Sequence, residues 1–289
     1  MTQPTLKPLE IAGQTFEWGR GTYLMGILNL TPDSFSGDGL ATDLDAAISQ
    51  VKLFEPEADL LDLGAESTRP NSTPVPVEME LARLLPALEA VKKYSLHPVS
   101  VDTFKPEVAR IALAAGAHII NDITGLREPA MRELVAETGV PVIVMHMRGT
   151  PQTMLNLTDY GGDVVGVLLE WFDKKLDELK AAGISREKII LDPGLGFAKN
   201  FEQNLEILHR LAEFKKLGQP LLIGLSRKSF VGRLVGGKNP PPPGPERDYG
   251  TAAGVALAIA GGADIIRVHN VPALAGAVRV ADAIARFRL

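Results

Sequence analysis

The sequence contains no cysteine among its 289 residues. It therefore forms no disulfide, offers no thiol nucleophile and has no sulfur ligand for a zinc or iron–sulfur site. Histidine is also scarce, and the five residues stand at positions 97, 118, 146, 209 and 269. No two of them are four residues apart, so a helical zinc motif is not expected. The absence of cysteine fits a reducing compartment, and we expect a cytoplasmic protein.

An excess of positive charge and a long hydrophobic run are missing too. Lys and Arg number 30 and Asp and Glu 35, which gives a formal net charge of −5. No cluster of basic residues marks a nucleic-acid-binding face. The N-terminal residues lack a basic start followed by an apolar core, so no signal peptide is expected. The most apolar helical stretch, residues 251–263, is too short and too rich in Gly and Ala to span a bilayer. We expect neither a nucleic-acid nor a membrane partner.

The sequence does contain one unit that recurs along its length: a short apolar run, a polar loop and an amphipathic stretch. Apolar runs of this length that turn polar at their last positions are typical of parallel strands buried on both faces. The predicted strands are 23–30, 59–64, 98–103, 117–122, 141–147, 188–194, 220–226 and 264–270. The predicted helices are 43–54, 78–93, 105–115, 129–138, 162–182, 202–217, 247–261 and 272–287.

Eight strands alternating with eight helices predict an α/β fold with a single (β/α)8 TIM barrel. A doubly wound open sheet is the alternative, but it rarely consists of eight such regular units. We expect an N-terminal extension over residues 1–22 that packs on the barrel, and one barrel domain over 23–289. The proline-rich stretch 236–248 is predicted to be an extended surface loop, because proline removes a backbone donor and fixes φ.

Residues able to do chemistry stand at the end of almost every predicted strand. The carboxyl ends of the strands form one rim of a barrel, and active sites are built there. The residues are Asn29, Asp62, Asp102, Asn121, Asp122, His146, Asp192, Ser226, Arg227, Lys228, Arg267 and His269. Helix capping explains some of the Asp, Asn and Ser residues, but not Lys228, Arg267 and His269. We therefore expect the active site at this rim.

Two loops at the rim carry further signals. Segment 31–39 is rich in Pro, Asp, Ser and Gly but contains Phe35, which predicts a lid over a flat ligand. Loop 64–76 presents Arg69, whose guanidinium fork suits a carboxylate or phosphate. Arg267 and His269 alternate along the last strand and so point to the same side, which favours an anion pocket. Lys228 suits a Schiff-base nucleophile, a phosphate clamp or a donor to a substrate carbonyl.

Seven segments, taken in order, resemble the motifs of the dihydropteroate synthase family. They are NLTPDSFSGDG, LGAESTRP, SVDTFKPEVA, NDITG, LDPGLGFAK, GLSRKSF and RVHN. The resemblance runs from about Tyr23 to the C-terminus. It departs from the family at Ala65, where members often have Gly, and at Asn270, where they often have Asp. Neither position is assigned a chemical role.

This resemblance implies a transferase of folate biosynthesis. The family joins p-aminobenzoate to the methylene carbon of (7,8-dihydropterin-6-yl)methyl diphosphate and releases pyrophosphate. The implied course is SN1-like, with loss of Mg²⁺-bound pyrophosphate first and attack by the arylamine second. The resemblance also implies Mg²⁺ as cofactor, a homodimer, and inhibition by sulfonamides, which mimic p-aminobenzoate.

Carried over residue by residue, the resemblance implies three subsites at the rim. The pterin pocket consists of Asp102, Asn121, Met145, Asp192, Phe197 and Lys228. The diphosphate site consists of Asn29, Thr68, Arg69, Arg267 and His269, and Asn29 is also the metal ligand. The p-aminobenzoate site consists of Phe35, Thr68, Arg69, Pro70, Lys228 and Ser229. The implied catalytic residues are Asn29, Asp33, Asp102, Lys228, Arg267 and His269.

Three other functions use part of the same pattern. A methyltetrahydrofolate-binding methyltransferase would share the Asp and Asn pocket but needs no diphosphate site, whereas SRKS, RVH and ESTRP together favour the synthase. An aldolase would use Lys228 as a Schiff base. A pterin-binding protein without activity would have little need of the anion-binding residues and loops.

Overall fold

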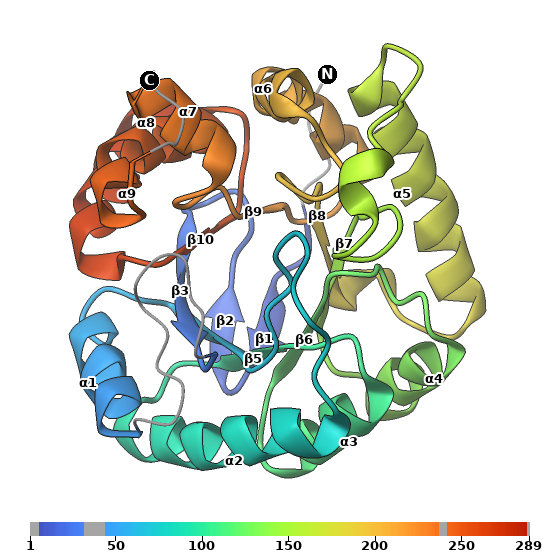
Figure 1. The fold of residues 1–289 in the computed structure, drawn as a ribbon, viewed down its shortest axis with the longest axis vertical. Coiled ribbons are helices and arrows are strands. Elements are labelled where there is room, and N and C mark those ends of the chain that lie inside the picture. The colour runs from blue at the N-terminus through green and yellow to red at the C-terminus, as the bar shows by residue number, and fades with distance from the viewer. Residues whose placement is uncertain (1–5, 32–43, 237–241, 288–289) are drawn as a thin grey trace.

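A barrel of parallel strands occupies the centre of the computed structural model, which describes residues 6–31, 44–236 and 242–287. Helices surround the strands (Figure 1). The eight strands are β3 Tyr23–Asn29, β4 Leu60–Gly64, β5 Val99–Asp102, β6 Ile119–Asp122, β7 Val142–Met145, β8 Ile189–Asp192, β9 Leu222–Ile223 and β10 Ile265–Val268. They pair in the order β8-β7-β6-β5-β4-β3-β10-β9. A bridge between Leu191 and Leu221 joins the two ends, so the predicted barrel is confirmed.

The helices follow the strands in the predicted alternation. They are α1 Leu44–Phe54, α2 Val77–Tyr94, α3 Pro106–Ala114, α4 Pro129–Thr138, α5 Val164–Ala181, α6 Phe201–His209, α7 Ser229–Gly236, α8 Asp248–Ala260 and α9 Val271–Ala285. Helix α7 is an addition that the pattern did not predict. The predicted helix 202–217 is in fact α6 followed by a 3-10 helix, Leu211–Leu217.

The proline-rich stretch differs from its prediction where the structure describes it. Residues 237–241 lie outside the described residues, but Pro245–Arg247 form a 3-10 helix rather than an extended chain. Pro245 is the first residue of this turn, where its missing N–H costs nothing and its fixed φ suits a helix. The extended-loop prediction is therefore wrong at these three residues, and also at its two ends, where Gly236 is the last residue of α7 and Asp248 the first of α8.

A short hairpin covers the amino end of the barrel. It consists of β1 Leu9–Ile11 and β2 Gln14–Phe16, joined by Ala12 and Gly13, which both have positive φ (51° and 77°), as a tight two-residue hairpin turn requires. Its apolar residues pack against inward-facing side chains from seven strands: Met25, Leu60, Ile119, Ile143, Ile190, Leu222 and Ile265. This layer, called the plug below, fills the barrel from its amino end.

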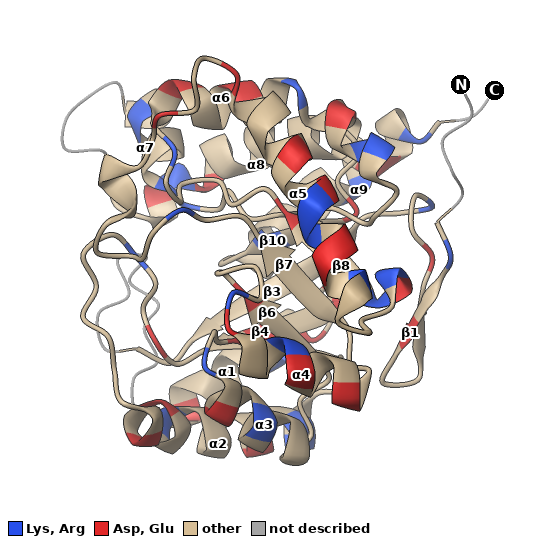
Figure 2. Cartoon of the chain, turned by 90° about the vertical axis from the view of Figure 1, so that its right-hand side faces the viewer, with Lys and Arg blue, Asp and Glu red and all other residues tan. Residues whose placement is uncertain are grey.

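The outer surface carries both signs of charge. In the view of Figure 2, Lys and Arg alternate with Asp and Glu over α2 to α5, without one continuous basic area. Over the part of the chain that is described, no helix combines the length and the apolar character that crossing a bilayer requires.

Candidate active site

The candidate site lies two residues beyond the plug along the strands. Successive side chains of a strand point to opposite faces, so the second residue after a plug residue again faces the barrel interior. The residues that this step reaches are Ile27, Asp62, Asn121, Met145, Asp192, Gly224 and Arg267. The interior thus changes from wholly apolar to mainly polar within one layer, at the carboxyl ends of the strands.

The strand ends of β3 to β6 are in register. Asn29 pairs with Gly64, Gly64 with Asp102, and Asp102 with Asn121. Gly64 leaves room between its neighbours, because a Cβ there would lie 3.9 Å from both Asn29 Oδ1 and Asp102 Oδ2. The amide of Asn29 and the carboxylate of Asp102 therefore border the same space.

An ion-pair network joins three of these strand ends to β10. Arg267 donates from Nε to Asp62 Oδ2 (2.5 Å) and from Nη2 to Asp102 Oδ2 (3.0 Å). Asn121 Nδ2 donates to the same oxygen of Asp62 (3.1 Å). The second oxygens of Asp62 and Asp102 are buried without a hydrogen-bond partner among the described residues. Two carboxylate oxygens are thus left to accept hydrogen bonds from a ligand.

The other half of the rim comes from β8, β9 and the loops that follow them. Asp192 Oδ1 accepts from the Gly194 amide (2.7 Å). Lys228 Nζ donates to the carbonyl of Leu195 and lies 4.9 Å from the centroid of the Phe197 ring. Lys228 reaches the network across Gly224, since a Cβ there would lie 4.0 Å from Lys228 Nζ and 3.9 Å from Arg267 Cβ.

An apolar surface adjoins this polar half. Met145 ends β7 beside Asp192 and belongs to a buried cluster against which Phe197 packs. The cluster also contains Ile123, Met147, Met154 and Ala198. A flat ring that met the carboxylates with its edge would have this surface available for one face.

Burial shifts the proton affinities of the site. It raises the pKa of Asp102 to about 7, with Arg267 opposing and the charge of Asp62 adding to the effect. Burial also raises the pKa of Asp192, although Lys228 opposes it. The pKa of Lys228 falls to about 8, again because of burial, with Asp192 opposing. A carboxylate and an ammonium whose pKa values lie near neutral pH, as those of Asp102 and Lys228 do, are typical of an active site.

The residues predicted for anion binding come from both sides of β3. Thr68 and Arg69 are half-buried and Pro70 is exposed in the loop after β4. His269 follows β10, where its amide donates to Ser226 Oγ (3.2 Å) and its Nδ1 lies 3.1 Å from the same oxygen. Ser229 is exposed at the start of α7.

Two predicted residues, Asp33 and Phe35, lie outside the described residues. Asn29 is the metal ligand that the family resemblance predicts. The described residues contain no group of three His, Asp or Glu side chains that could hold an ion. Asn270, which departs from the family pattern, has a structural role: its side chain caps α9 at the Ala273 amide and donates to Asp248.

Two residues of the site belong to no subsite predicted from the sequence: Asp62, which was predicted at the rim, and Lys199. Asp62 is fully buried and contacts both Arg267 and Asn121. Its signal was a strand-end Asp in an apolar run. Lys199 is buried, and its Nζ lies 3.1 Å from His146 Nδ1 and donates to the carbonyl of Phe197 (2.9 Å). It ties the loop that carries Phe197 to the end of β7, which no local pattern indicates.

Comparison with known proteins identifies the family. The profile of the family described as "Pterin binding enzyme" matches residues 25–269. A dihydropteroate synthase of Synechocystis sp. is 47% identical over 281 residues, 96% of each chain. One of Escherichia coli is 45% identical over 263 residues, 90% of this chain and 91% of its own.

Solved structures of similar sequence have the same fold. The Yersinia pestis dihydropteroate synthase, in complex with a sulfonamide drug, superposes with a TM-score of 0.90 at 39% identity, over 96% of this chain and 99% of its own. The Xanthomonas albilineans dihydropteroate synthase, in complex with 7,8-dihydropteroate, gives 0.83 at 37% identity, over 97% and 99%. The chain therefore belongs to the pterin binding enzyme family and, within it, to the dihydropteroate synthases, which are transferases.

Proposed function

We propose that the rim site joins p-aminobenzoate to (7,8-dihydropterin-6-yl)methyl diphosphate, giving 7,8-dihydropteroate and pyrophosphate. The C–O bond to the diphosphate breaks, a C–N bond to the arylamine forms, and the amine loses a proton. The observation that carries the proposal is the network in which Arg267 holds Asp62 and Asp102 beside Asn121. This network combines acceptors for a pterin edge with a cation for an anionic group.

In this proposal the pterin edge meets the buried carboxylates of Asp102 and Asp192. A pterin carries N–H donors along one edge and a ring carbonyl, so it needs acceptors and one donor. Asp102 and Asp192 supply acceptors, Asn121 supplies an amide, and Lys228 donates to the carbonyl. Met145 and Phe197 cover the ring. The negative charge of Asp102 balances positive charge that develops on the pterin as the leaving group departs.

The diphosphate lies on the other side of Arg267. Nε and Nη2 face the two aspartates, and no acceptor among the described residues contacts Nη1. We assign Nη1 to a phosphate oxygen, together with Thr68, Arg69 and His269. Arg267 then contacts both the diphosphate and the carboxylate of Asp102 that stabilises the pterin, so it links the charge on the leaving group to the charge on the pterin.

Mg²⁺ fits the donor set at Asn29. The amide oxygen faces the space over Gly64, and Mg²⁺ commonly takes one or two protein oxygens and completes its shell with phosphate oxygens and water. A metal bound with the diphosphate would neutralise charge on the leaving group. With or without the metal, we assign Asn29 to orienting the diphosphate, because it lies at a strand end and only Gly64 separates it from Asp102 across the sheet.

The arylamine enters last. We propose that Phe35, Thr68, Arg69, Pro70 and Ser229 bind p-aminobenzoate, with Arg69 and Lys228 near its polar groups, and that Asp33 acts from the first loop. Departure of pyrophosphate before attack by the arylamine fits a site built to stabilise separated charges. A sulfonamide that occupies the same subsite should raise the apparent KM for p-aminobenzoate.

The test is an assay of 7,8-dihydropteroate formation from both substrates, with Mg²⁺ and with a chelator. We expect product and pyrophosphate in equal amounts, and a large loss of rate with the chelator. Methyl transfer from methyltetrahydrofolate without dihydropteroate formation would favour the methyltransferase. Substrate trapped on Lys228 by borohydride would favour the aldolase. Pterin binding without turnover would indicate the inactive binding protein.

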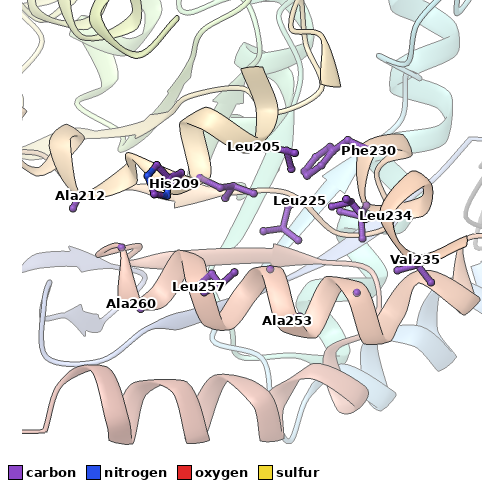
Figure 3. A pocket seen from close by; sticks show the side chains of 15 residues that line it. Leu205, His209, Ala212, Leu225, Phe230, Leu234, Val235, Ala253, Leu257 and Ala260 are labelled. Carbon is purple, nitrogen blue, oxygen red and sulfur yellow. The ribbon is translucent and has the colours of Figure 1, made fainter. Parts of the chain in front are cut away.

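We propose a homodimer that associates through α8 and α9. These helices expose large apolar residues, including Leu257 (68%) and Ile284 (73%). Beside them a groove of about 650 Å³ runs between α6, α7 and α8 (Figure 3). Apart from His209 its lining is apolar, and it contains none of the predicted site residues. A second copy would remove this face from water.

We also propose a cytoplasmic location, since the charged substrates do not cross a bilayer unaided.

A further inference from the structure

A buried ionic cluster holds the base of the loop that carries Thr68 and Arg69. Lys105 Nζ donates to Glu66 Oε2 (2.7 Å), to Glu80 Oε2 (2.6 Å) and to the carbonyl of Val75 (2.7 Å). Glu66 Oε1 accepts from the Val75 amide (3.1 Å). Residues 66 and 75 are thereby joined, and the chain between them forms a closed loop.

The cluster is unlike a surface ion pair. The side chains of Glu66, Glu80 and Lys105 are 5%, 1% and 17% exposed. Burial raises the pKa of Glu80, and Lys105 opposes this. Burial lowers the pKa of Lys105, but its hydrogen bonds to Glu66 and Glu80 outweigh that effect and raise it. A cluster of buried charges costs desolvation, so its value lies more in fixing one geometry than in stability.

The tip of the same loop is held separately. The Asn71 amide donates to the carbonyl of Pro151 (3.0 Å), and Gln152 Nε2 donates to the carbonyl of Ser72 (2.6 Å). Lys105 itself stands three residues after Asp102 on the segment between β5 and α3. One ammonium therefore connects the strand end that carries Asp102 to the loop that carries Thr68 and Arg69.

We propose that Glu66, Glu80 and Lys105 form a positioning clasp that sets the loop 66–75 against the rim. The residues touch no substrate. They place Thr68 and Arg69 at a fixed distance from Asp102, so that the subsites for the pterin and for the diphosphate and p-aminobenzoate keep one spacing. This inference rests on the proposed function for its effect on turnover, but the clasp itself has a structural readout.

Lys105→Met tests the clasp in the full-length protein, because methionine keeps the length and removes the three donors. The matched control is Lys215→Met, which breaks a comparably buried pair with Asp264 (2.7 Å) at the amino end of the barrel. Hydrogen exchange of the segment 66–76, resolved to the Val75 amide, reports the loop without any substrate. Steady-state kinetics and calorimetry with a pterin that lacks the diphosphate report the subsites.

We expect exchange at Val75 to become about tenfold faster in Lys105→Met and to stay unchanged in Lys215→Met, since a charge-assisted bond that closes the loop is lost. The KM for p-aminobenzoate should rise about tenfold in Lys105→Met only, while affinity for the diphosphate-free pterin stays within about twofold. Unchanged exchange at Val75 overturns the clasp whether or not the wild type is active. The clasp is also overturned if exchange at Val75 becomes faster while the KM values stay unchanged. It is overturned as well if affinity for the diphosphate-free pterin falls as much as the KM for p-aminobenzoate rises.

The experiment distinguishes failure of the proposed function from failure of the clasp, and it allows for a variant that does not fold. If the wild type forms no dihydropteroate, the proposed function fails, while the exchange result still decides the clasp. If Lys105→Met does not fold, Glu66→Gln replaces it, because the amide is isosteric and cannot hold both the Val75 amide and the ammonium as the carboxylate does. Exchange at Val75 and the substrate measurements are then made on Glu66→Gln, and the same results would overturn the clasp.

Discussion

Arg267 is the residue on which the site depends most. Its guanidinium neutralises two buried carboxylates, Asp62 and Asp102, from a position between them. Removing one partner from a buried ionic group leaves charge without compensation, which costs more than the group itself contributes. The residue was predicted to bind the diphosphate, and its contacts add a second task, that of keeping both aspartates in place.

Arg267→Ala should therefore lower kcat/KM for the pterin diphosphate by about 10²- to 10³-fold, the scale seen when one preorganised donor to developing charge is removed. Affinity for a diphosphate-free pterin should fall too, because Asp102 loses its partner. Arg286→Ala is the control, since Arg286 pairs with Asp282 (2.9 Å) far from the rim. Unchanged affinity for the diphosphate substrate would overturn the assignment.

Asp102 and Lys228 give the reaction a pH profile with two limbs. The pKa of Asp102 is raised to about 7, so the needed carboxylate is lost as pH falls through that value. The pKa of Lys228 is lowered to about 8, so the needed ammonium is lost as pH rises through that value. The pH dependence of kcat/KM reports the pKa values of groups in the free enzyme. It should therefore be bell-shaped, with its maximum between about pH 7 and pH 8.

The profile is measured with the pterin diphosphate as the varied substrate at constant ionic strength. Asp102→Asn removes the titrating carboxylate, so the low-pH limb should disappear together with most of the activity, while the high-pH limb remains. A wild-type profile that is flat from about pH 6 to 9 contradicts the roles of both groups.

At the scale of elements, the alternation of side chains along each strand places the apolar residues of the plug and the polar residues of the site in two successive layers of the barrel interior. Ile265 belongs to the plug and Arg267 to the site, and Leu60 and Asp62 show the same two-residue step. A shift of one residue in a strand would turn both side chains out of the barrel. The plug therefore does more than fill space, because it fixes the height at which the polar layer begins.

The sequence could predict the strand ends but not their contacts. Apolar runs that end in Asn29, Asp102 or Asp192 are local patterns, and they give the rim residues because all parallel strands end on one side. Contacts are non-local: Arg267 and Asp62 are 205 positions apart, and their pairing depends on barrel closure and register. Asp62 looked like one strand-end residue among many until its partners were known.

Elements held by tertiary contacts were missed for a related reason. Helix α7 has only eight residues, so it has no clear periodicity of its own. The hairpin β1–β2 has strands of three residues each, and it is stable only because its apolar side chains enter the plug. Such elements depend on what they pack against more than on their own pattern.

The proposed role of residues 1–22 as an extension that packs on the barrel is tested at Phe16. This side chain is buried in the plug, so Phe16→Ala should cost about 3–5 kcal/mol in the free energy of unfolding, measured by urea denaturation. The site lies a layer away, so kcat and KM at low temperature should change little. Glu10→Ala, on the exposed face of the same hairpin, should cost less than about 0.5 kcal/mol. Equal costs for the two variants would contradict the plug.

On the scale of the whole molecule, the barrel keeps chemistry and association apart. Every residue proposed to bind substrate belongs to the rim or its loops. Helices α8 and α9, in contrast, lie side by side in the outer helix layer (Figure 1), and they expose Leu257 and Ile284. If two copies associate through this layer, each keeps a full rim. Association should then affect stability without supplying a residue to the partner's site.

Leu257→Glu combined with Ile284→Glu should therefore produce a monomer that retains turnover per chain, because two buried carboxylates at a dimer interface have no partner. Sedimentation velocity across a concentration series measures the change, and kcat is measured on the same samples. Leu96→Glu is the control, since Leu96 is 86% exposed on another face and should leave the dimer intact. A dimer that survives the double substitution would exclude α8 and α9 as the interface. Loss of kcat in a folded monomer would show that the rim depends on the partner, against the separation of chemistry and association argued from the fold.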